Sequence, residues 1–386
     1  MNKEKRKVPK LRFPDCNRLW EEYRLADLLV ERSVLCTQSE KYPLVSFTVE
    51  SGVTPKTERY DREALVVGHK ASKKYKMTLV DDIVYNPANL KFGAIARNKY
   101  GNAVFSPIYV TLEVQTNRVF PKFIEYILTS KCFINRALRY QQGTVYERQS
   151  VNVESLLLQT VNIPAKDEQI KISDLLYKFD QLLGLYQHKL KMLLLKKKAL
   201  LQKLFPKDGE RYPELRFPGF TDAWEQRKLS DILKVNSGKD YKHLDQGNIP
   251  VYGTGGYMLS MNESLSNIDA IGIGRKGTID KPQYLKAPFW TVDTLFYLTA
   301  LDKHSILFLY YLMQLIPWKK FDESTGVPSL SKTTIDNISG FVPSNSKEEE
   351  LISALFNQLD KSITLHQRKL DHLQLQKKAL LQQMFV

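Results

Sequence analysis

A long amphipathic segment occurs twice in this chain, at residues 171–205 and again 180 positions later at residues 351–385. In both copies the core positions alternate in steps of three and four over about four heptads, which is typical of a coiled-coil seam. The predicted seam positions are Leu176, Phe179, Leu183, Tyr186, Leu190 and Leu193 in the first copy, and Phe356, Leu359, Ile363, His366, Leu370 and Leu373 in the second. We therefore expect two long helices that pack on each other; the alternative is a long helix lying along its own domain.

Other segments of the chain recur in the same order. Pro9–Pro14 returns as Pro213–Pro218, each followed by a Trp-Glu pair, and the stretch around Lys91 matches the stretch around Arg275. A series of repeats in conserved order predicts one module of about 190 residues used twice. Lys197 and Lys377 fall in the two seams, where a polar residue commonly fixes the register.

Each module is predicted to begin with short strands and to end in the long helix. Runs rich in β-branched and aromatic residues predict strands at 42–49, 83–85, 108–114, 268–273 and 291–298, and shorter helices follow at about 121–140 and 304–321. Two like modules that share one seam usually relate by a two-fold axis. The expected fold is therefore α+β, with two similar domains joined by two long antiparallel coiled-coil helices with pseudo-two-fold symmetry. The expected boundaries are 1–165 for the first domain, 166–206 for the first long helix, 207–343 for the linker and second domain, and 344–386 for the second long helix.

The chain is strongly basic. Its 386 residues include 57 Lys and Arg against 42 Asp and Glu, a net charge of +15. Such an excess favours a polyanionic partner, nucleic acid first and an anionic membrane second. The sequence has no apolar run long enough to span a bilayer, no apolar signal-peptide core at its start and only three scattered cysteines. We therefore expect a cytoplasmic protein.

Two short motifs invite a catalytic interpretation that their context does not support. Gly272–Gly277 fits GxGxxG, but Pro282 and the residues after it exclude the long helix that a dinucleotide site needs. Asn86-Pro87 lacks the second proline and the aromatic residue of amino-methyltransferases. The histidines show no ligand spacing and no Ser-His-Asp arrangement. The sequence predicts a non-catalytic chain that binds no metal or cofactor itself.

Polar and basic residues in the loops are better candidates for contact with DNA. Arg, Gln and Lys side chains can bond base edges, while Ser, Thr and Tyr favour phosphates. The loops at 140–150 and 324–332 hold the same position in the two modules. The candidate DNA-binding residues are Lys91, Arg97, Tyr146, Arg148, Gln149, Tyr252, Arg275, Lys276 and Lys332. For each one alone, an ordinary solvated side chain is the competing interpretation.

Three stretches of the sequence resemble a known family. Residues 215–232, residues 271–298 and the terminal Lys377–Phe385 are similar to the specificity subunit of Type I restriction–modification enzymes. The resemblance covers essentially the whole chain, including its duplication. It implies two target-recognition domains held apart by the long helices, each reading half of a gapped, asymmetric site on double-stranded DNA.

The same resemblance implies partner subunits that carry the chemistry. The family's subunit docks modification (methyltransferase) subunits, which use S-adenosylmethionine, and restriction (helicase-nuclease) subunits, which use ATP and Mg²⁺. Two other classes of protein stay open on the residues alone. One is a stand-alone architectural or regulatory DNA-binding protein, and the other is an enzyme such as a nuclease.

Overall fold

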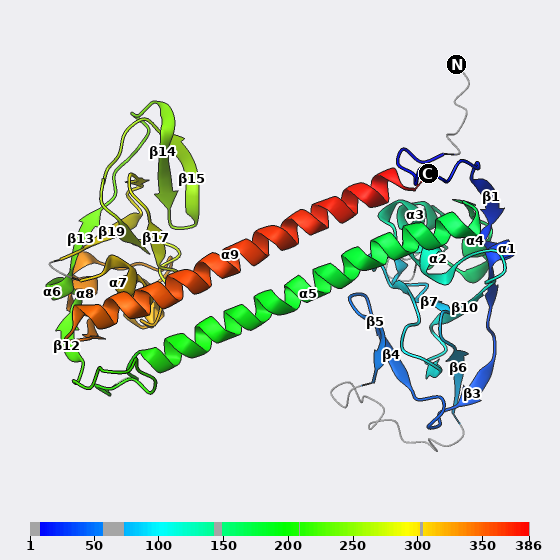
Figure 1. The fold of residues 1–386 in the computed structure, drawn as a ribbon, viewed down its shortest axis with the longest axis horizontal. Coiled ribbons are helices and arrows are strands. Elements are labelled where there is room, and N and C mark those ends of the chain that lie inside the picture. The colour runs from blue at the N-terminus through cyan, green and yellow to red at the C-terminus, as the bar shows by residue number, and fades with distance from the viewer. Residues whose placement is uncertain (1–7, 57–72, 143–148, 208, 302–303, 386) are drawn as a thin grey trace. The chain divides into compact units, whose positions relative to one another are not determined.

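The computed structural model describes residues 8–56, 73–142, 149–207, 209–301 and 304–385. The chain divides into two compact units (Figure 1). Unit 1 comprises Met1–Gly184 with Asp371–Val386, and unit 2 comprises Leu185–Leu370. Two long helices, α5 (Lys166–Leu204) and α9 (Ser346–Gln383), therefore contribute one part to each unit. The predicted α+β class is confirmed.

Unit 1 is built on a four-stranded sheet in the order β2-β10-β7-β8, with β1 paired to β11, a three-stranded sheet β3-β6-β9 and a hairpin β4-β5. Its strands are β1 (Glu21–Arg24), β2 (Leu29–Glu31), β3 (Leu35–Thr37), β4 (Val45–Thr48), β5 (Gly52–Pro55), β6 (Lys74–Thr78), β7 (Ile83–Tyr85), β8 (Ile95–Arg97), β9 (Ala103–Phe105), β10 (Val110–Val114) and β11 (Thr160–Ile163). Its shorter helices are α1 (Leu25–Leu28), η4 (Leu90–Phe92), α2 (Pro121–Leu128), α3 (Lys131–Ala137), η5 (Leu138–Tyr140) and α4 (Val153–Leu157).

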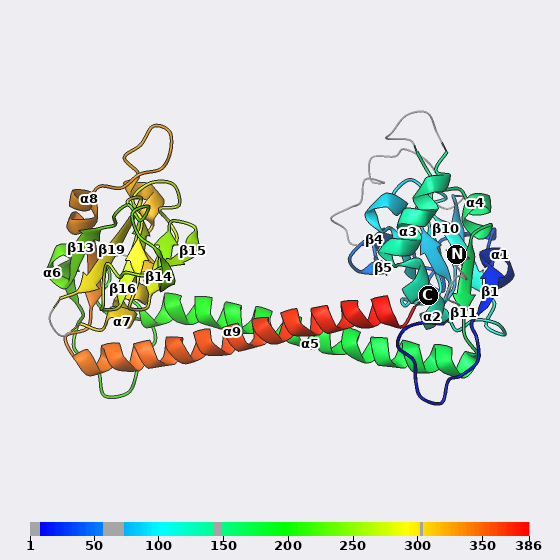
Figure 2. The same cartoon turned by 90° about the horizontal axis from the view of Figure 1, so that it is seen from above.

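Unit 2 repeats this frame with a different front half. A four-stranded sheet β13-β19-β16-β17 replaces β2-β10-β7-β8, and β12-β20 replaces β1-β11. Figure 2 shows strands β13, β19 and β16 of this sheet. A three-stranded sheet β15-β14-β18 is found in unit 2 alone among the described residues. The strands are β12 (Glu225–Lys228), β13 (Leu233–Ser237), β14 (Gln246–Gly253), β15 (Gly256–Met261), β16 (Ala270–Gly274), β17 (Gln283–Leu285), β18 (Trp290–Thr291), β19 (Leu295–Ala300) and β20 (Ser339–Val342). The shorter helices are α6 (Leu229–Ile232), α7 (Ile306–Met313), η7 (Trp318–Phe321) and α8 (Lys332–Asn337).

The predicted single helix at 121–140 is wrong, because the segment forms α2 and α3 with a break between them. Ser130 has extended backbone at the break, and its hydroxyl caps α3 by accepting a hydrogen bond from the Phe133 amide. A serine that can cap a new helix competes with continuation of the old one. The predicted helix at 304–321 is likewise wrong, because α7 ends at Met313 and the short helix η7 follows.

We call the strands and shorter helices of each unit its head. The repeated Leu-Arg-Phe-Pro segment joins both long helices to each head. In unit 1 the Arg12 guanidinium donates to both carboxylate oxygens of Glu168 near the start of α5, and the Leu11 amide donates to the Gln383 carbonyl at the end of α9 (2.9 Å). Figure 1 shows α5 and α9 running through both units.

Unit 2 makes the same contacts with the helices exchanged. Arg216 donates to both oxygens of Glu348 near the start of α9 (2.7 and 2.8 Å). The Leu215 amide donates to the Lys203 carbonyl near the end of α5 (2.8 Å). The repeat at offset 204 therefore encodes a bidentate ion pair at the beginning of one long helix and a backbone contact at the end of the other.

Aromatic residues at the ends of the long helices complete this junction. Phe385 packs against Trp20 and Phe123 in unit 1, with ring centroids 6.3 and 5.4 Å apart. In unit 2, Phe205 packs against Trp224 and Phe308 at 5.8 and 5.3 Å. Both tryptophans are 1% exposed, so each helix end is part of the core of the head that it meets.

The long helices are shielded from solvent along the face that the 3-4 spacing selects. Each of the twelve predicted seam residues is buried or half-buried, whereas the side chains between them are mostly exposed. Within unit 2 the helices run antiparallel, because Tyr186 of α5 contacts His366 of α9 and Lys197, farther along α5, pairs with Asp360, earlier in α9 (2.7 Å). Within unit 1, Lys377 forms the equivalent pair with Asp180.

The aspartates that pair with the seam lysines also connect the long helices to the heads. The Tyr311 hydroxyl of α7 donates to Asp360 (2.9 Å), and the Tyr126 hydroxyl of α2 donates to Asp180 (2.7 Å). In each unit, one aspartate thus accepts from a head tyrosine and a lysine of the facing long helix.

Among the described residues, no helix is both long and apolar enough to cross a membrane.

Replacing Arg216 by alanine should destabilise unit 2 by about 3–5 kcal/mol, because the Glu348 carboxylate, whose side chain is 1% exposed, would lose its partner. The matched control is Arg227→Ala, which breaks an exposed pair with Glu225 and should cost no more than about 1 kcal/mol. Urea unfolding followed by tryptophan fluorescence measures both. Equal effects of the two substitutions would contradict the structural importance of the Arg216–Glu348 pair.

Leu370→Asp should lower stability by several kcal/mol, since it places an unpaired charge at a seam position that is 6% exposed. Leu375→Asp, on the same helix at a position 65% exposed, should change stability by less than about 0.5 kcal/mol. Thermal unfolding of the two variants compares them directly. Coincident unfolding curves would show that the seam does not hold the helices.

Candidate nucleic-acid interface

A tight turn after β16 presents two cations of unit 2 to solvent. Arg275 and Lys276 are exposed and follow the buried Gly274. A Cβ at Gly274 would lie 2.2 Å from the Thr278 carbonyl oxygen, and Gly277 has a φ of 89°. The close approach at Gly274 and the positive φ at Gly277 each favour glycine over any residue with a Cβ. These glycines therefore belong to a strand turn, as the sequence predicts, and not to a nucleotide loop.

The loop at 322–331 is built by its own carboxylates. The Asp322 carboxylate accepts hydrogen bonds from the Ser324 and Ser329 amides (3.0 and 2.9 Å), and these bonds lower its pKa. Glu323 accepts from the Ser331 hydroxyl (2.9 Å). Both acidic side chains thus bond to the loop itself, and residues 325–328, between Ser324 and Ser329, form an exposed tip.

This loop is bonded to the turn that carries the cations. The Gly277 amide donates to the Pro328 carbonyl (2.8 Å), and the Leu330 amide donates to the Arg275 carbonyl (3.0 Å). The two segments, about fifty residues apart in sequence, form one surface. Lys332, the first residue of α8, is exposed just beyond the loop.

The tip of the β14-β15 hairpin reaches the same turn. A Cβ at Gly277 would lie 3.8 Å from the Thr254 hydroxyl oxygen. The Gln283 side chain donates to the Gly253 and Thr254 carbonyls (3.0 and 3.1 Å), which fixes the tip. We name the surface formed by the turn 274–277, the loop 322–332 and the hairpin tip 253–257 the basic face of unit 2. It contains four predicted DNA contacts, namely Tyr252 at its edge, Arg275, Lys276 and Lys332.

Strand pairing corrects the predicted equivalence of Lys91 and Arg275. Ile83 pairs with Leu112, and Ile271 pairs with Leu298, so that Ile83 corresponds to Ile271. Counting from these positions, the residue of unit 1 that is equivalent to Arg275 is Pro87, four residues before Lys91.

A loop contact agrees with this register. The Val151 amide donates to the Pro87 carbonyl (3.1 Å), as the Leu330 amide donates to that of Arg275. The prediction that Lys91 and Arg275 hold the same position in the two modules is wrong. It aligned the two residues by sequence similarity, 184 positions apart, and ignored a shift in the loop that follows the strand. Lys91 lies instead in the short helix η4.

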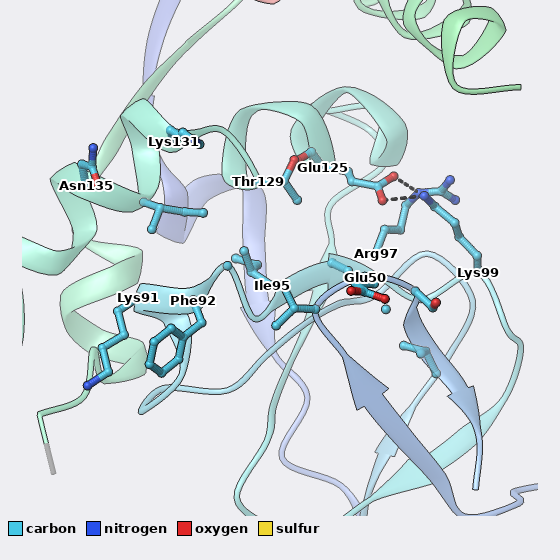
Figure 3. Close-up of a pocket in the computed structure, with 17 residues that line it drawn as sticks. Glu50, Lys91, Phe92, Ile95, Arg97, Lys99, Glu125, Thr129, Lys131 and Asn135 are labelled. Atoms are coloured by element: carbon cyan, nitrogen blue, oxygen red, sulfur yellow. Dashed lines mark hydrogen bonds and ion pairs between the residues drawn. The ribbon is translucent and has the colours of Figure 1, made fainter. Parts of the chain in front are cut away.

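Unit 1 has a cleft of about 710 Å³ beside η4 (Figure 3). The β4-β5 turn, η4 with β8, and helices α2 and α3 line it. Lys91 and Lys131 contribute cations, whereas Lys99 pairs with Glu125 of the same lining (2.7 Å), and Phe92 is 64% exposed. The cleft thus brings together basic and aromatic side chains, the combination that binds backbone and bases of nucleic acids.

Arg97, a further predicted DNA contact, lies at the inner side of this cleft and is 9% exposed. Its guanidinium donates to Glu125 (2.9 Å; Figure 3) and also to Asp81. Burial alone would lower its pKa, but the hydrogen bonds to the two carboxylates outweigh burial and raise it. These contacts give Arg97 a structural part; a DNA contact by it stays a prediction.

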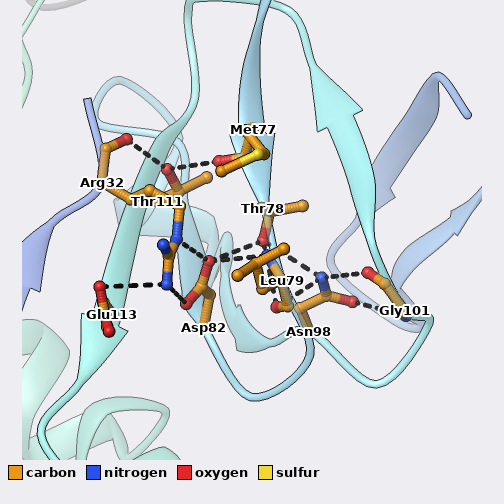
Figure 4. Close-up of polar contacts among 9 residues, drawn as sticks. All are labelled: Arg32, Met77, Thr78, Leu79, Asp82, Asn98, Gly101, Thr111 and Glu113. Atoms are coloured by element: carbon orange, nitrogen blue, oxygen red, sulfur yellow. Dashed lines mark hydrogen bonds and ion pairs between the residues drawn. The ribbon is translucent and has the colours of Figure 1, made fainter. Parts of the chain in front are cut away.

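A second polar network, most of it buried, lies beside β10 in unit 1 (Figure 4). Arg32 donates to both oxygens of Asp82 (2.8 and 3.0 Å) and contacts Glu113 (3.2 Å). The Asn98 amide donates to the Leu79 and Gly101 carbonyls. The network joins β2, β10 and the turn after β6, and since each carboxylate is paired we assign it to folding.

The remaining predicted DNA contacts lie in the loop at 140–150. Tyr146 and Arg148 fall outside the described residues, and Gln149 is half-buried next to the Gln142–Ser150 bridge. Sequence reasoning overlooked Phe92, Val327 and Tyr257, which are 64%, 66% and 63% exposed. For Tyr257 the Gly-Thr-Gly-Gly run before it was a usable signal, because such a run between two strands favours a hairpin.

Comparisons with known proteins agree with the observed fold. Residues 221–375 match the family model described as "Type I restriction modification DNA specificity domain". A stretch of 99 residues is 26% identical to the Type I restriction enzyme MjaVIII specificity subunit of Methanocaldococcus jannaschii. This match covers 24% of this chain and 23% of that protein, so it spans about a quarter of the curated relative.

Solved structures match over nearly the whole chain. The Type I restriction–modification S subunit from M. genitalium superposes with a TM-score of 0.70 at 18% identity, covering 98% of this chain and 99% of that one. A chain from work on complex assembly and conformational transition of the type I R-M system matches with a TM-score of 0.50 at 15% identity, covering 96% and 98%. Residues 221–375 therefore match a Type I restriction–modification DNA specificity domain, and the chain as a whole has the fold of the solved S subunit, in agreement with the resemblance found in the sequence.

Proposed function

We propose that this chain is the sequence-specific DNA-binding subunit of a Type I restriction–modification complex. In this proposal each unit reads one half of a bipartite, gapped site on double-stranded DNA. The observation that carries the proposal is the basic face of unit 2, where Arg275 and Lys276 are exposed on a turn that is bonded to the loop and lies beside the hairpin tip. A rigid surface with exposed cations suits a duplex, because little conformational entropy is lost on binding.

Charge supports DNA as the partner. The net charge of +15 gives long-range attraction to a polyanion. Arg275 and Lys276 are exposed, in contrast to the seam lysines Lys197 and Lys377, which form ion pairs inside the units. The two front halves have different strands and loops, which suits two half-sites of different sequence.

The chain is proposed to be a non-catalytic subunit. Among the described residues no group of three or more His, Cys, Asp or Glu could hold a metal ion, and the buried Asp82 carboxylate is paired with Arg32. S-adenosylmethionine, ATP and Mg²⁺ are expected on the partner subunits. The proposal places DNA recognition in the heads and leaves the chemistry to those partners.

The long helices are proposed to dock the modification and restriction subunits. On the part of α5 that belongs to unit 2, Leu185, Met192 and Leu195 lie outside the seam and are 47%, 51% and 51% exposed. Exposed apolar residues on a helix face commonly mark a protein contact. A stand-alone architectural or regulatory DNA-binding protein is the second candidate; co-purification with modification subunits from the host would exclude it.

DNA binding by the purified complex should weaken steeply with salt, because phosphate neutralisation releases counterions. Arg275→Ala should act on one half-site alone. If Arg275 contacts a phosphate, affinity falls for every sequence and the slope of log Kd against log salt shrinks by about one. If it contacts a base edge, binding loses about 1–3 kcal/mol and recognition relaxes at one position.

The matched control is Arg227→Ala, which removes the same charge from strand β12 and should leave both the salt slope and the sequence preference unchanged. Fluorescence anisotropy across a salt series measures the slope, and footprinting on the host's site assigns the half-site. A flat salt dependence of the unaltered complex would contradict DNA binding by the basic heads. Unchanged protection with Arg275→Ala would remove Arg275 from the interface.

A further inference from the structure

We propose that unit 2 reads a thymine through Val327, whose side chain contacts the 5-methyl group of that base in the major groove. This inference rests on the proposed function and goes beyond it by naming one residue and one base atom. Val327 is 66% exposed at the tip of the loop, between Ser324 and Ser329, whose amides both donate to the Asp322 carboxylate.

The loop that carries Val327 is ordered by polar contacts at its base. Asp322 bonds Ser324 and Ser329 across the loop, and the Glu323 amide donates to the Ser329 carbonyl (3.1 Å). Because these bonds define the loop without any help from Val327, the valine is not needed to fold it. The protein therefore presents an apolar, β-branched side chain, which has few rotamers, to solvent at a fixed place.

The surroundings of Val327 indicate which partner it meets. The next residue, Pro328, accepts from the Gly277 amide, and Leu330 donates to the Arg275 carbonyl, so the tip lies beside the exposed Arg275 and Lys276. An anionic partner drawn to these cations must also offer an apolar group to the valine. Duplex DNA offers such a group in its major groove as the thymine 5-methyl, which apolar side chains contact directly.

The acidic residues of the loop do not oppose this placement. The Asp322 carboxylate accepts from two backbone amides and the Ser324 hydroxyl, and Glu323 accepts from the Ser331 amide and hydroxyl. Both residues are exposed, and these hydrogen bonds occupy their carboxylate oxygens with donors of the loop itself. The tip therefore offers the approaching duplex a methyl-bearing side chain flanked by cations.

Deoxyuridine differs from thymidine only by the missing 5-methyl group, so it tests the contact atom by atom. With the host's site in hand, each thymine is replaced in turn by deoxyuridine and the Kd of the full complex is measured. For one thymine, removal of the methyl should weaken binding about fourfold, the factor that corresponds to about 0.8 kcal/mol per buried methylene-sized group. Val327→Ala should weaken binding to the thymine site similarly and should abolish the difference between thymine and uracil at that position.

Val34→Ala is the matched control, since it truncates an exposed valine (50%) between β2 and β3 of unit 1 and should keep the response to uracil at the same position. If Val327→Ala retains the response at every thymine, or if no thymine responds, the inference is overturned. Specific binding with unchanged ratios would overturn the inference alone. Absence of any sequence preference in the unaltered complex would overturn the proposed function as well.

Discussion

The ion pair between a Leu-Arg-Phe-Pro arginine and a glutamate at the start of a long helix holds each head in place. Arg12 and Arg216 make this pair in units 1 and 2, and both glutamates are almost fully buried. A buried carboxylate without its arginine would carry a large desolvation cost, so the pair constrains the angle at which the helix begins. The adjacent leucine amides bond the end of the other helix, which makes each head a junction of both helices.

The frame could be predicted from the sequence because it is periodic and repeated. The 3-4 spacing selected the side chains that the helices shield, and the strand at Ile83–Tyr85 was predicted with its observed bounds. The helix at 121–140 was wrong because Ser130 starts a new helix, a local capping choice that apolar periodicity does not reveal. The match of Lys91 to Arg275 was wrong because it followed residue similarity through a loop, where strand pairing alone sets the register.

The candidate site was harder to predict than the frame, for a physical reason. Its surface depends on contacts between segments far apart in sequence, such as the Gly277 amide with the Pro328 carbonyl. Arg97 shows why residue type alone does not predict a DNA contact. This basic side chain lies near a loop, but it donates to Glu125 and Asp81. Arg275 and Lys276 were found from sequence because glycines on either side signalled a turn, whereas nothing in the sequence marked Val327.

In the proposed function, two different heads on one duplicated frame recognise the DNA. The most direct test of this function is modified-base sequencing of host DNA with and without the gene for this chain. We predict that deletion removes modification from one motif composed of two short specified parts separated by an unspecified gap of fixed length. An unchanged modification pattern, or loss at a single uninterrupted motif, would contradict it.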